Sequence, residues 1–365
     1  MSEHAADFFS ATYCDARAEF LSACLQRKLA VDSYVNPLRG PHGERLVCDV
    51  TRIGPADAKH VVVVTSAAHG VEGFCGSGIQ VGLLRTAISP LENSDVALVL
   101  VHALNPYGFA WIRRVNEDNV DLNRNFVDHE GKNYPENEMF AELVDGILPS
   151  SLDDATVQAC RKIIAAAEAK YGEVPVRKAS AKGQYHYPQS MAFGGTHATW
   201  SNRTLHEICT QQAVGARSVA LVDLHSGLGP YGYGELMTPS KPGEAVFDQF
   251  HAWYGDQVHS TTVGKSDYAG SKGSILAGFH PPLGDDVAFA ALGVEFGTID
   301  RPMVRDAVRD DHWLHVHGQL DSEVGRAIKA RLRDAFYPDK DDWKTAVWMR
   351  GQEVVTTALD RIAAA

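Results

Sequence analysis

The sequence has few cysteines, no long hydrophobic run and no excess of basic residues. Its six cysteines are scattered over 365 residues without a Cys-x-x-Cys pair, so we expect reduced thiols rather than a disulfide framework. The most apolar stretches, such as 61–64 and 97–101, are too short to cross a bilayer. The first residues lack a basic region followed by an apolar core, so we expect no secretion signal and a cytoplasmic location.

Basic charge and a familiar nucleophile motif are also scarce. The chain has 34 Lys and Arg against 46 Asp and Glu, a formal net charge of −12. This balance argues against nucleic acid and anionic membrane surfaces as partners. The absence of a Gly-x-Ser-x-Gly elbow removes the visible nucleophile of a serine hydrolase of the α/β type. The 45% apolar content is that of an ordinary globular protein.

Short apolar, β-branched segments alternate with helical patterns along the chain. Buried strands are expected at 61–67, 95–104, 218–224 and 292–296. A Gly-rich loop is expected at 70–78, and helices near 79–88, 136–147, 153–171 and 199–213. The alternation predicts an α/β sheet with helices on both faces. We expect one domain over 1–365, with a long loop insertion near 172–200 and a helical segment over 302–365.

Two of these strands are followed by residues that bind metals. His69 and Glu72 lie three positions apart just past 61–67, and His225 follows the strand at 218–224. Ligand sites in open α/β sheets gather where strands end in loops. Two imidazoles and one carboxylate, with a fourth position open for water, form the catalytic type of zinc site. Alone, a His-x-x-Glu pair is weak evidence, and one histidine after a strand is more often structural.

Other charged residues and histidines of the sequence each allow two interpretations. Arg113, Arg114 and Arg124 are close together in an acidic chain, which fits either an anion site or a surface salt-bridge network. Glu295 interrupts the apolar strand at 292–296, either because it has a partner or because it reaches water at the strand end. For the cluster of His312, His315 and His317 near a predicted helix, a solvated face is the preferred interpretation.

The order of these motifs is more specific than any one of them. Along the chain stand His-x-x-Glu at 69–72, Asn-Pro-Tyr-Gly-Phe at 105–109, the arginines 113–114, Asp-Leu-Asn-Arg-Asn-Phe at 121–126, Asp-Leu-His-Ser at 223–226 and the strand glutamate 295. This set closely resembles the zinc metallocarboxypeptidase superfamily, and within it a little-characterised bacterial carboxypeptidase-like branch of unknown function. The resemblance implies a mixed, mainly parallel sheet between helices.

The resemblance also implies a role for each motif residue. His69, Glu72 and His225 match the ligands of one Zn²⁺ per chain. Glu295 matches the general base. Either of the adjacent Arg113 and Arg114 could match the arginine that stabilises the oxyanion, and the spacing to Asn116 favours Arg114.

Further matches concern the substrate and the ligand environment. Asn123 and Arg124 match the pair that holds the substrate's terminal carboxylate, and Arg113 is expected to assist in substrate binding. Asp121 matches an aspartate that hydrogen-bonds the ligand His69. Tyr268 is the tyrosine nearest to the place of the family's mobile tyrosine, with Phe279 and His280 as alternatives, so no role is assigned.

These residues predict a zinc hydrolase that cleaves an amide bond beside a free carboxylate of a small peptide. Removal of the acyl group from an acylated amino acid, as in aspartoacylase-like enzymes, is the alternative, because those enzymes share the same motifs. A non-haem iron protein, which also uses two histidines and a carboxylate, and a non-catalytic binding protein rank lower. The oligomeric state is left open.

Overall fold

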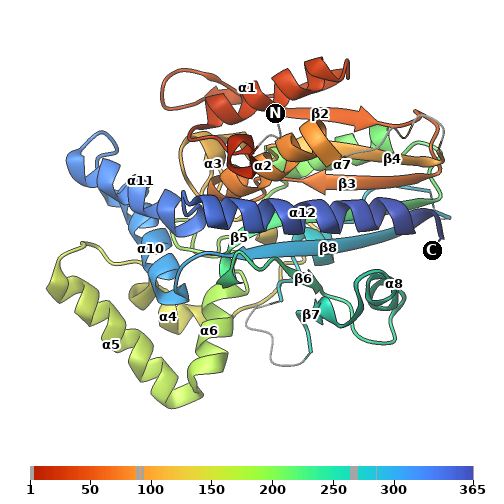
Figure 1. Cartoon of the computed structure of the whole chain (residues 1–365). Helices are drawn as coiled ribbons and strands as arrows, with labels where there is room; N and C mark the ends of the chain where they lie inside the picture. The colour runs from red at the N-terminus through yellow and green to blue at the C-terminus, as the bar shows by residue number, and fades with distance from the viewer. Residues whose placement is uncertain (1–3, 88–90, 92–93, 264–269, 285, 365) are drawn as a thin grey trace.

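A mixed eight-stranded sheet runs through the described part of the chain. The computed structural model describes residues 4–87, 91, 94–263, 270–284 and 286–364 (Figure 1). The strands are β1 (Val31–Arg39), β2 (Arg45–Ile53), β3 (His60–Thr65), β4 (Val96–His102), β5 (Ser218–Tyr231), β6 (Glu235–Thr238), β7 (Val258–Ser260) and β8 (Ala288–Gly297). Their order in the sheet is β1-β2-β4-β3-β5-β8-β6-β7.

The middle of the sheet is parallel. Strands β4, β3, β5 and β8 pair in parallel with one another, whereas β1, β2 and β6 join the sheet through antiparallel pairs. The carboxyl ends of the four parallel strands therefore meet at one edge, where β3 and β5 deliver the candidate ligands. This arrangement confirms the predicted α/β fold class.

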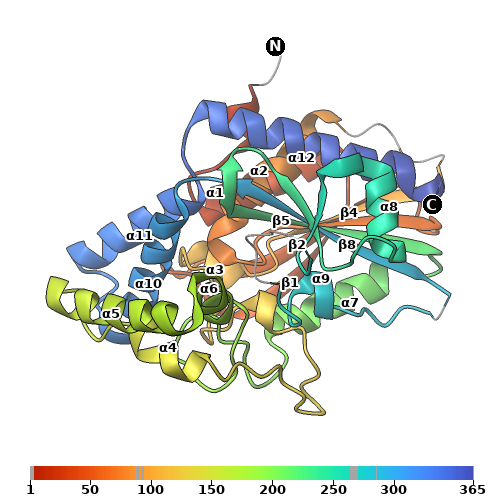
Figure 2. The ribbon, with the colours of Figure 1, turned by 90° about the horizontal axis from the view of Figure 1, so that it is seen from below.

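Helices cover both faces of this sheet. The α-helices are α1 (Tyr13–Gln26), α2 (Gly73–Gly82), α3 (Pro106–Ala110), α4 (Phe140–Ile147), α5 (Asp154–Tyr171), α6 (Glu173–Ala181), α7 (Trp200–Gln212), α8 (Ala245–Tyr254), α9 (Ile275–Gly278), α10 (Arg301–His317), α11 (Glu323–Phe336) and α12 (Asp341–Arg361). Figure 2 shows α1, α2 and α12 on one side of the strands and α7 and α9 on the other. Within the described residues, no helix has both the length and the apolar character needed to cross a membrane.

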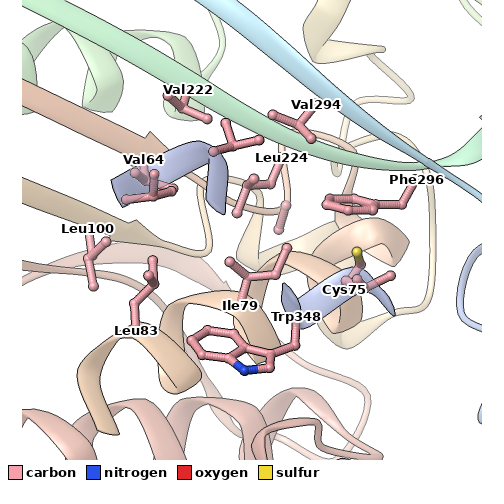
Figure 3. Close-up of a cluster of buried hydrophobic side chains, with 14 of the residues drawn as sticks. Val64, Cys75, Ile79, Leu83, Leu100, Val222, Leu224, Val294, Phe296 and Trp348 are labelled. Atoms are coloured by element: carbon pink, nitrogen blue, oxygen red, sulfur yellow. The ribbon is translucent and has the colours of Figure 1, made fainter. Parts of the chain in front are cut away.

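Alternation along the buried strands builds the core on both faces. Val64 and its neighbours of the same parity pack toward α2 and α12, against Ile79 and Trp348 (Figure 3). Val61 and Val63 point the other way, into the cluster that contains Ile208 of α7. Each face therefore takes every second residue, which explains why β3 is an uninterrupted apolar run.

The structure corrects two local expectations. The predicted Gly-rich loop at 70–78 is helical from Gly73 onward, because its glycines permit close packing: a Cβ at Gly76 would lie 2.6 Å from the Cβ of Ser66. The predicted loop insertion at 172–200 begins with a helix, α6. Pro175 lies in the first turn of α6, where a missing N–H costs little, so this proline does not break the helix. The segment 302–364 contains α10, α11 and α12.

Candidate metal centre

Three buried side chains converge at the carboxyl ends of β3 and β5. His69 follows β3 and precedes a short 3-10 turn, Gly70–Glu72, which places Glu72 one turn later. The Glu72 carboxylate lies between two imidazoles: Oε1 is 2.9 Å from Nδ1 of His69, and Oε2 is 2.7 Å from Nδ1 of His225. One donor atom from each residue lies within 4.8 Å of the others, so the three could hold one metal ion.

The other nitrogen of each histidine faces a buried carboxylate. Nε2 of His69 donates to Asp121 Oδ1 at 3.1 Å, and Nε2 of His225 donates to Asp223 Oδ2 at 2.6 Å. These bonds place the Nε2 protons and leave both Nδ1 atoms pointing at Glu72. A carboxylate behind each imidazole is the usual arrangement around a metal-binding histidine. The donor set therefore fits a divalent cation such as Zn²⁺.

Asp223 was not predicted as a site residue, although the sequence contains a signal for it. Asp223 and His225 are two apart on β5, so their side chains point to the same face of the strand. Its second oxygen, Oδ1, accepts a hydrogen bond from Thr65 Oγ1 at 2.6 Å. Both oxygens of the Asp223 carboxylate thus accept a hydrogen bond, which fixes its orientation.

Arg114 connects the carboxylates of the site. Its Nη1 donates to Glu72 Oε1 and its Nη2 to Asp121 Oδ2, both at 3.2 Å. Burial alone would raise the pKa of Asp121, but Arg114, Arg124 and His69 hold it well below its usual value. Burial opposes ionisation of Glu72 too, and the imidazoles of His69 and His225 outweigh it and lower the pKa. Both carboxylates are therefore ionised: Glu72 faces the two candidate ligand histidines, and Asp121 faces His69 and Arg114.

Glu295 stands beside His225 on the neighbouring strand. The two residues are direct partners in the parallel β5–β8 pair, so their side chains lie on the same face of the sheet. Glu295 is 8% exposed, and its Oε1 accepts a hydrogen bond from the backbone N–H of Leu228 at 3.0 Å. Burial, and then the charge of Glu72, raise its pKa.

Asn123 and Arg124 lie on a second 3-10 turn, Leu122–Arg124, next to the site. Asn123 Oδ1 accepts from the backbone N–H of Ile275 at 3.0 Å. Its Nδ2 lies 3.3 Å from His225 Nε2, which is itself a donor to Asp223, so the amide N–H groups stay available for a ligand. Arg124 donates from Nε and Nη2 to Ala181 O and from Nη1 to Asn123 O. Of its five N–H donors, two are left for an anion.

Arg113 does not join these residues. Its Nε donates to Asp311 Oδ2 at 3.4 Å and its Nη2 to Asn119 Oδ1 at 3.0 Å. Asp311 also accepts from Lys329 Nζ at 2.5 Å. The expected part of Arg113 in substrate binding does not fit this position, because its guanidinium is buried in an ion-pair network and does not line the cavity described below.

The expected solvated face for the histidines of α10 is wrong for His312. It is 1% exposed, and its Nδ1 donates to the backbone oxygen of Val308 at 3.0 Å. Burial lowers its pKa to about 4. His315 lies against Lys329 Nζ at 2.7 Å, whereas His317 is exposed.

The site opens into a cavity of about 710 Å³, within the size range of small-molecule sites. His69, Glu72, His225, Arg114 and Glu295 all line it. Asp121, Asn123 and Arg124 line it as well.

Part of the 172–200 segment hydrogen-bonds to the backbone of residues that line this cavity. Phe193 O accepts from the backbone N–H of Asp121 at 2.8 Å, and Tyr185 Oη donates to Arg124 O at 2.6 Å. Tyr268 lies outside the described residues, and Phe279 is buried among aromatic side chains.

Comparisons with known proteins give one family and several distantly similar solved structures. No curated protein matches the sequence. Among solved structures, carboxypeptidase A from Helicoverpa armigera is 14% identical, with a TM-score of 0.40 and coverage of 90% of this chain and 74% of that chain. The murein-tripeptide amidase from Escherichia coli O157 is 13% identical, with a TM-score of 0.34 and coverage of 82% and 92%. Residues 9–350 match the family described as a protein of unknown function, DUF2817, and the chain belongs to this family.

Proposed function

We propose that the chain is a zinc-dependent hydrolase that cleaves an amide bond beside a free carboxylate, as a carboxypeptidase does. One observation carries the proposal: His69, Glu72 and His225 converge in the same cavity as a buried glutamate and a cavity-lining arginine. Zn²⁺ bound by such ligands would acidify a water molecule and polarise a carbonyl group. The remaining chemistry falls to the side chains around it.

Glu295 and Arg114 are suited to the proton transfer and to the developing charge. The backbone N–H of Leu228 holds Oε1 of Glu295, so Oε2 is the atom that takes a proton from water and returns it to the leaving amine. Arg114 uses one N–H on Glu72 and one on Asp121, which leaves three donors for an oxyanion. A lost oxyanion donor typically costs about a hundredfold to a thousandfold in turnover.

Asn123 and Arg124 are suited to hold the free carboxylate of the substrate. The two remaining N–H groups of Arg124 and the amide of Asn123 line the same cavity as Glu295. A planar guanidinium binds a carboxylate with paired, charge-assisted hydrogen bonds. A neutral ligand end would leave the two remaining N–H groups of buried Arg124 without an anion to bind.

Hydrolysis assays of the purified full-length chain test the proposal. A panel of peptides with free or amidated carboxyl ends, and of N-acyl amino acids, is assayed after metal removal and after addition of Zn²⁺ or Fe²⁺. We expect Zn²⁺-dependent release of the carboxyl-terminal residue from free-acid peptides only. Cleavage confined to N-acyl amino acids would replace the peptidase assignment by the deacylase.

Glu295→Gln should abolish this activity while Zn²⁺ remains bound. Glu235→Gln is the matched control, because Glu235 stands opposite Glu295 in the β6–β8 pair but does not line the cavity. Full activity of Glu295→Gln would contradict the role of Glu295 as the base. No cleavage of any substrate under any metal condition would overturn the proposed function.

A further inference from the structure

The cavity has a second wall, made of helices rather than strand ends. Residues of α4, α5, α6 and α10 line it together with the metal centre. Figures 1 and 2 both show these helices gathered at one end of the molecule, with the end of α12 at the opposite end. Outside the metal centre, the charged residues of the lining are Arg161, Glu168, Glu173, Arg177, Arg301, Arg305, Asp306 and Arg309.

The arginines of this wall follow the helical repeat. Arg301, Arg305 and Arg309 are four residues apart on α10, so they lie along one face of that helix. Arg161 of α5 and Arg177 of α6 come to the same cavity from facing helices. We call these five residues the arginine wall. A single helix face turned toward one cavity is a directed arrangement, unlike charges scattered over a surface.

One carboxylate faces three members of the arginine wall. Asp306 lies 3.0 Å from Arg309, 3.5 Å from Arg305 and 3.6 Å from Arg161. The two longer contacts are loose, and the side chains of Arg161 and Arg305 are 54% and 64% exposed. A second carboxylate, Asp310, also accepts from Arg309 at 2.7 Å. With Asp310, Glu168 and Glu173 included, the five arginines still outnumber the four carboxylates, in a chain whose net charge is −12.

We propose that the arginine wall binds a second anionic group of the substrate, so that the site takes acidic peptides with a carboxylate upstream of the cleaved bond. This inference rests on the proposed function, in which Arg124 holds the carboxylate beside that bond. Guanidinium groups are well suited to a second carboxylate, which they bind by paired hydrogen bonds. The positive wall would also attract an anionic substrate that the rest of the acidic surface repels.

Two N-acetyl tripeptides test the inference. They differ in one residue, glutamate or glutamine, two positions before the free carboxyl end. We expect the unaltered protein to show a higher kcat/KM for the glutamate peptide. In the double variant Arg161→Gln/Arg305→Gln, the ratio of the two kcat/KM values should fall by about threefold to tenfold, as expected for two partly exposed ion pairs. Arg361→Gln, at the far end of α12, should keep the ratio (Figure 1).

Binding measurements separate this inference from the proposed function. Calorimetry of the full-length Glu295→Gln variant with both tripeptides reports affinity without turnover. Suppose that the unaltered protein cleaves neither peptide, that the glutamate peptide still binds more tightly than the glutamine peptide, and that Arg161→Gln/Arg305→Gln removes this difference in affinity. The proposed function then fails and the anion site stands. Equal kcat/KM and equal affinity for the two peptides, or a preference that the double variant keeps, would overturn the inference.

Discussion

Replacement of Asp223 by asparagine should weaken metal binding by about tenfold to a hundredfold, the usual effect of losing a partner behind a metal-binding histidine. Asp223 Oδ2 accepts the Nε2–H of His225, and Oδ1 accepts from Thr65. Both contacts are buried and measure 2.6 Å, so the carboxylate determines which imidazole nitrogen has the proton.

Asparagine offers one acceptor and one donor at the same place. If its NH₂ group faces His225, Nε2 has to accept, the proton moves to Nδ1, and that nitrogen loses the lone pair a cation needs. If its oxygen faces His225, the tautomer survives, but a neutral acceptor replaces a charged one and the hydrogen bond loses about half its strength. Either outcome lowers affinity, and a factor of ten corresponds to about 1.4 kcal/mol.

The assay is competition for Zn²⁺ between the metal-free protein and a chromogenic chelator, with circular dichroism to verify the fold. Thr65→Val is the matched control: it removes the other hydrogen bond of Asp223 and keeps the carboxylate. We expect Thr65→Val to reduce the free energy of unfolding by about 1–3 kcal/mol, from an unsatisfied buried oxygen, with little change in Zn²⁺ affinity. A folded Asp223→Asn variant that binds Zn²⁺ like the unaltered protein would refute the tautomer argument.

Three further outcomes follow from the geometry. Arg113→Gln should lower the free energy of unfolding, measured in urea, by about 3 kcal/mol. This is the low end of the range for breaking a buried ion pair, because Lys329 still pairs with Asp311, and a loss below about 1 kcal/mol would contradict the prediction. Between pH 6.5 and about 4, the histidine at position 312 takes up a proton in the unfolded chain but not when it is buried in the folded protein. As the pH falls through this range, the free energy of unfolding of the unaltered protein should therefore decrease by about 3 kcal/mol relative to that of His312→Asn. Parallel pH profiles of the two proteins would contradict this prediction. Zn²⁺ at a thousand times its Kd should stabilise the fold by about 4 kcal/mol in thermal unfolding, and His225→Gln should abolish this gain.

The sequence predicts the middle of the sheet better than its edges. Strands β3, β4, β5 and β8 contain apolar runs because they are covered on both faces, and such runs are visible without coordinates. Strand β1 is an edge strand whose residues are mostly exposed, and it contains Pro37, so its pattern resembles a loop. Tertiary pairing, rather than local composition, makes it a strand.

Within the site, the sequence predicts residue types and their spacing but not where neighbouring side chains point. His69 and Glu72 could be predicted because three residues make one tight turn after a strand. The choice between Arg113 and Arg114 depends on contacts with residues far along the chain, such as Asp311, which is 198 positions from Arg113. Local pattern contains no information on such contacts.

The two arginines share one backbone anchor and differ in the partners of their side chains. The carbonyl of Arg113 accepts from the N–H of Val71, and the carbonyl of Arg114 accepts from the N–H of Gly70, so both are fastened to the turn between His69 and Glu72. From that common base, Arg114 returns to Glu72, whereas Arg113 reaches Asp311 on α10. One dipeptide thus connects the turn of the candidate metal centre to the helix that contains Arg305. The two side chains end on different partners, Asp311 and Glu72, while the backbone bonds to Gly70 and Val71 hold both residues in place, so these bonds oppose an exchange of the two contacts.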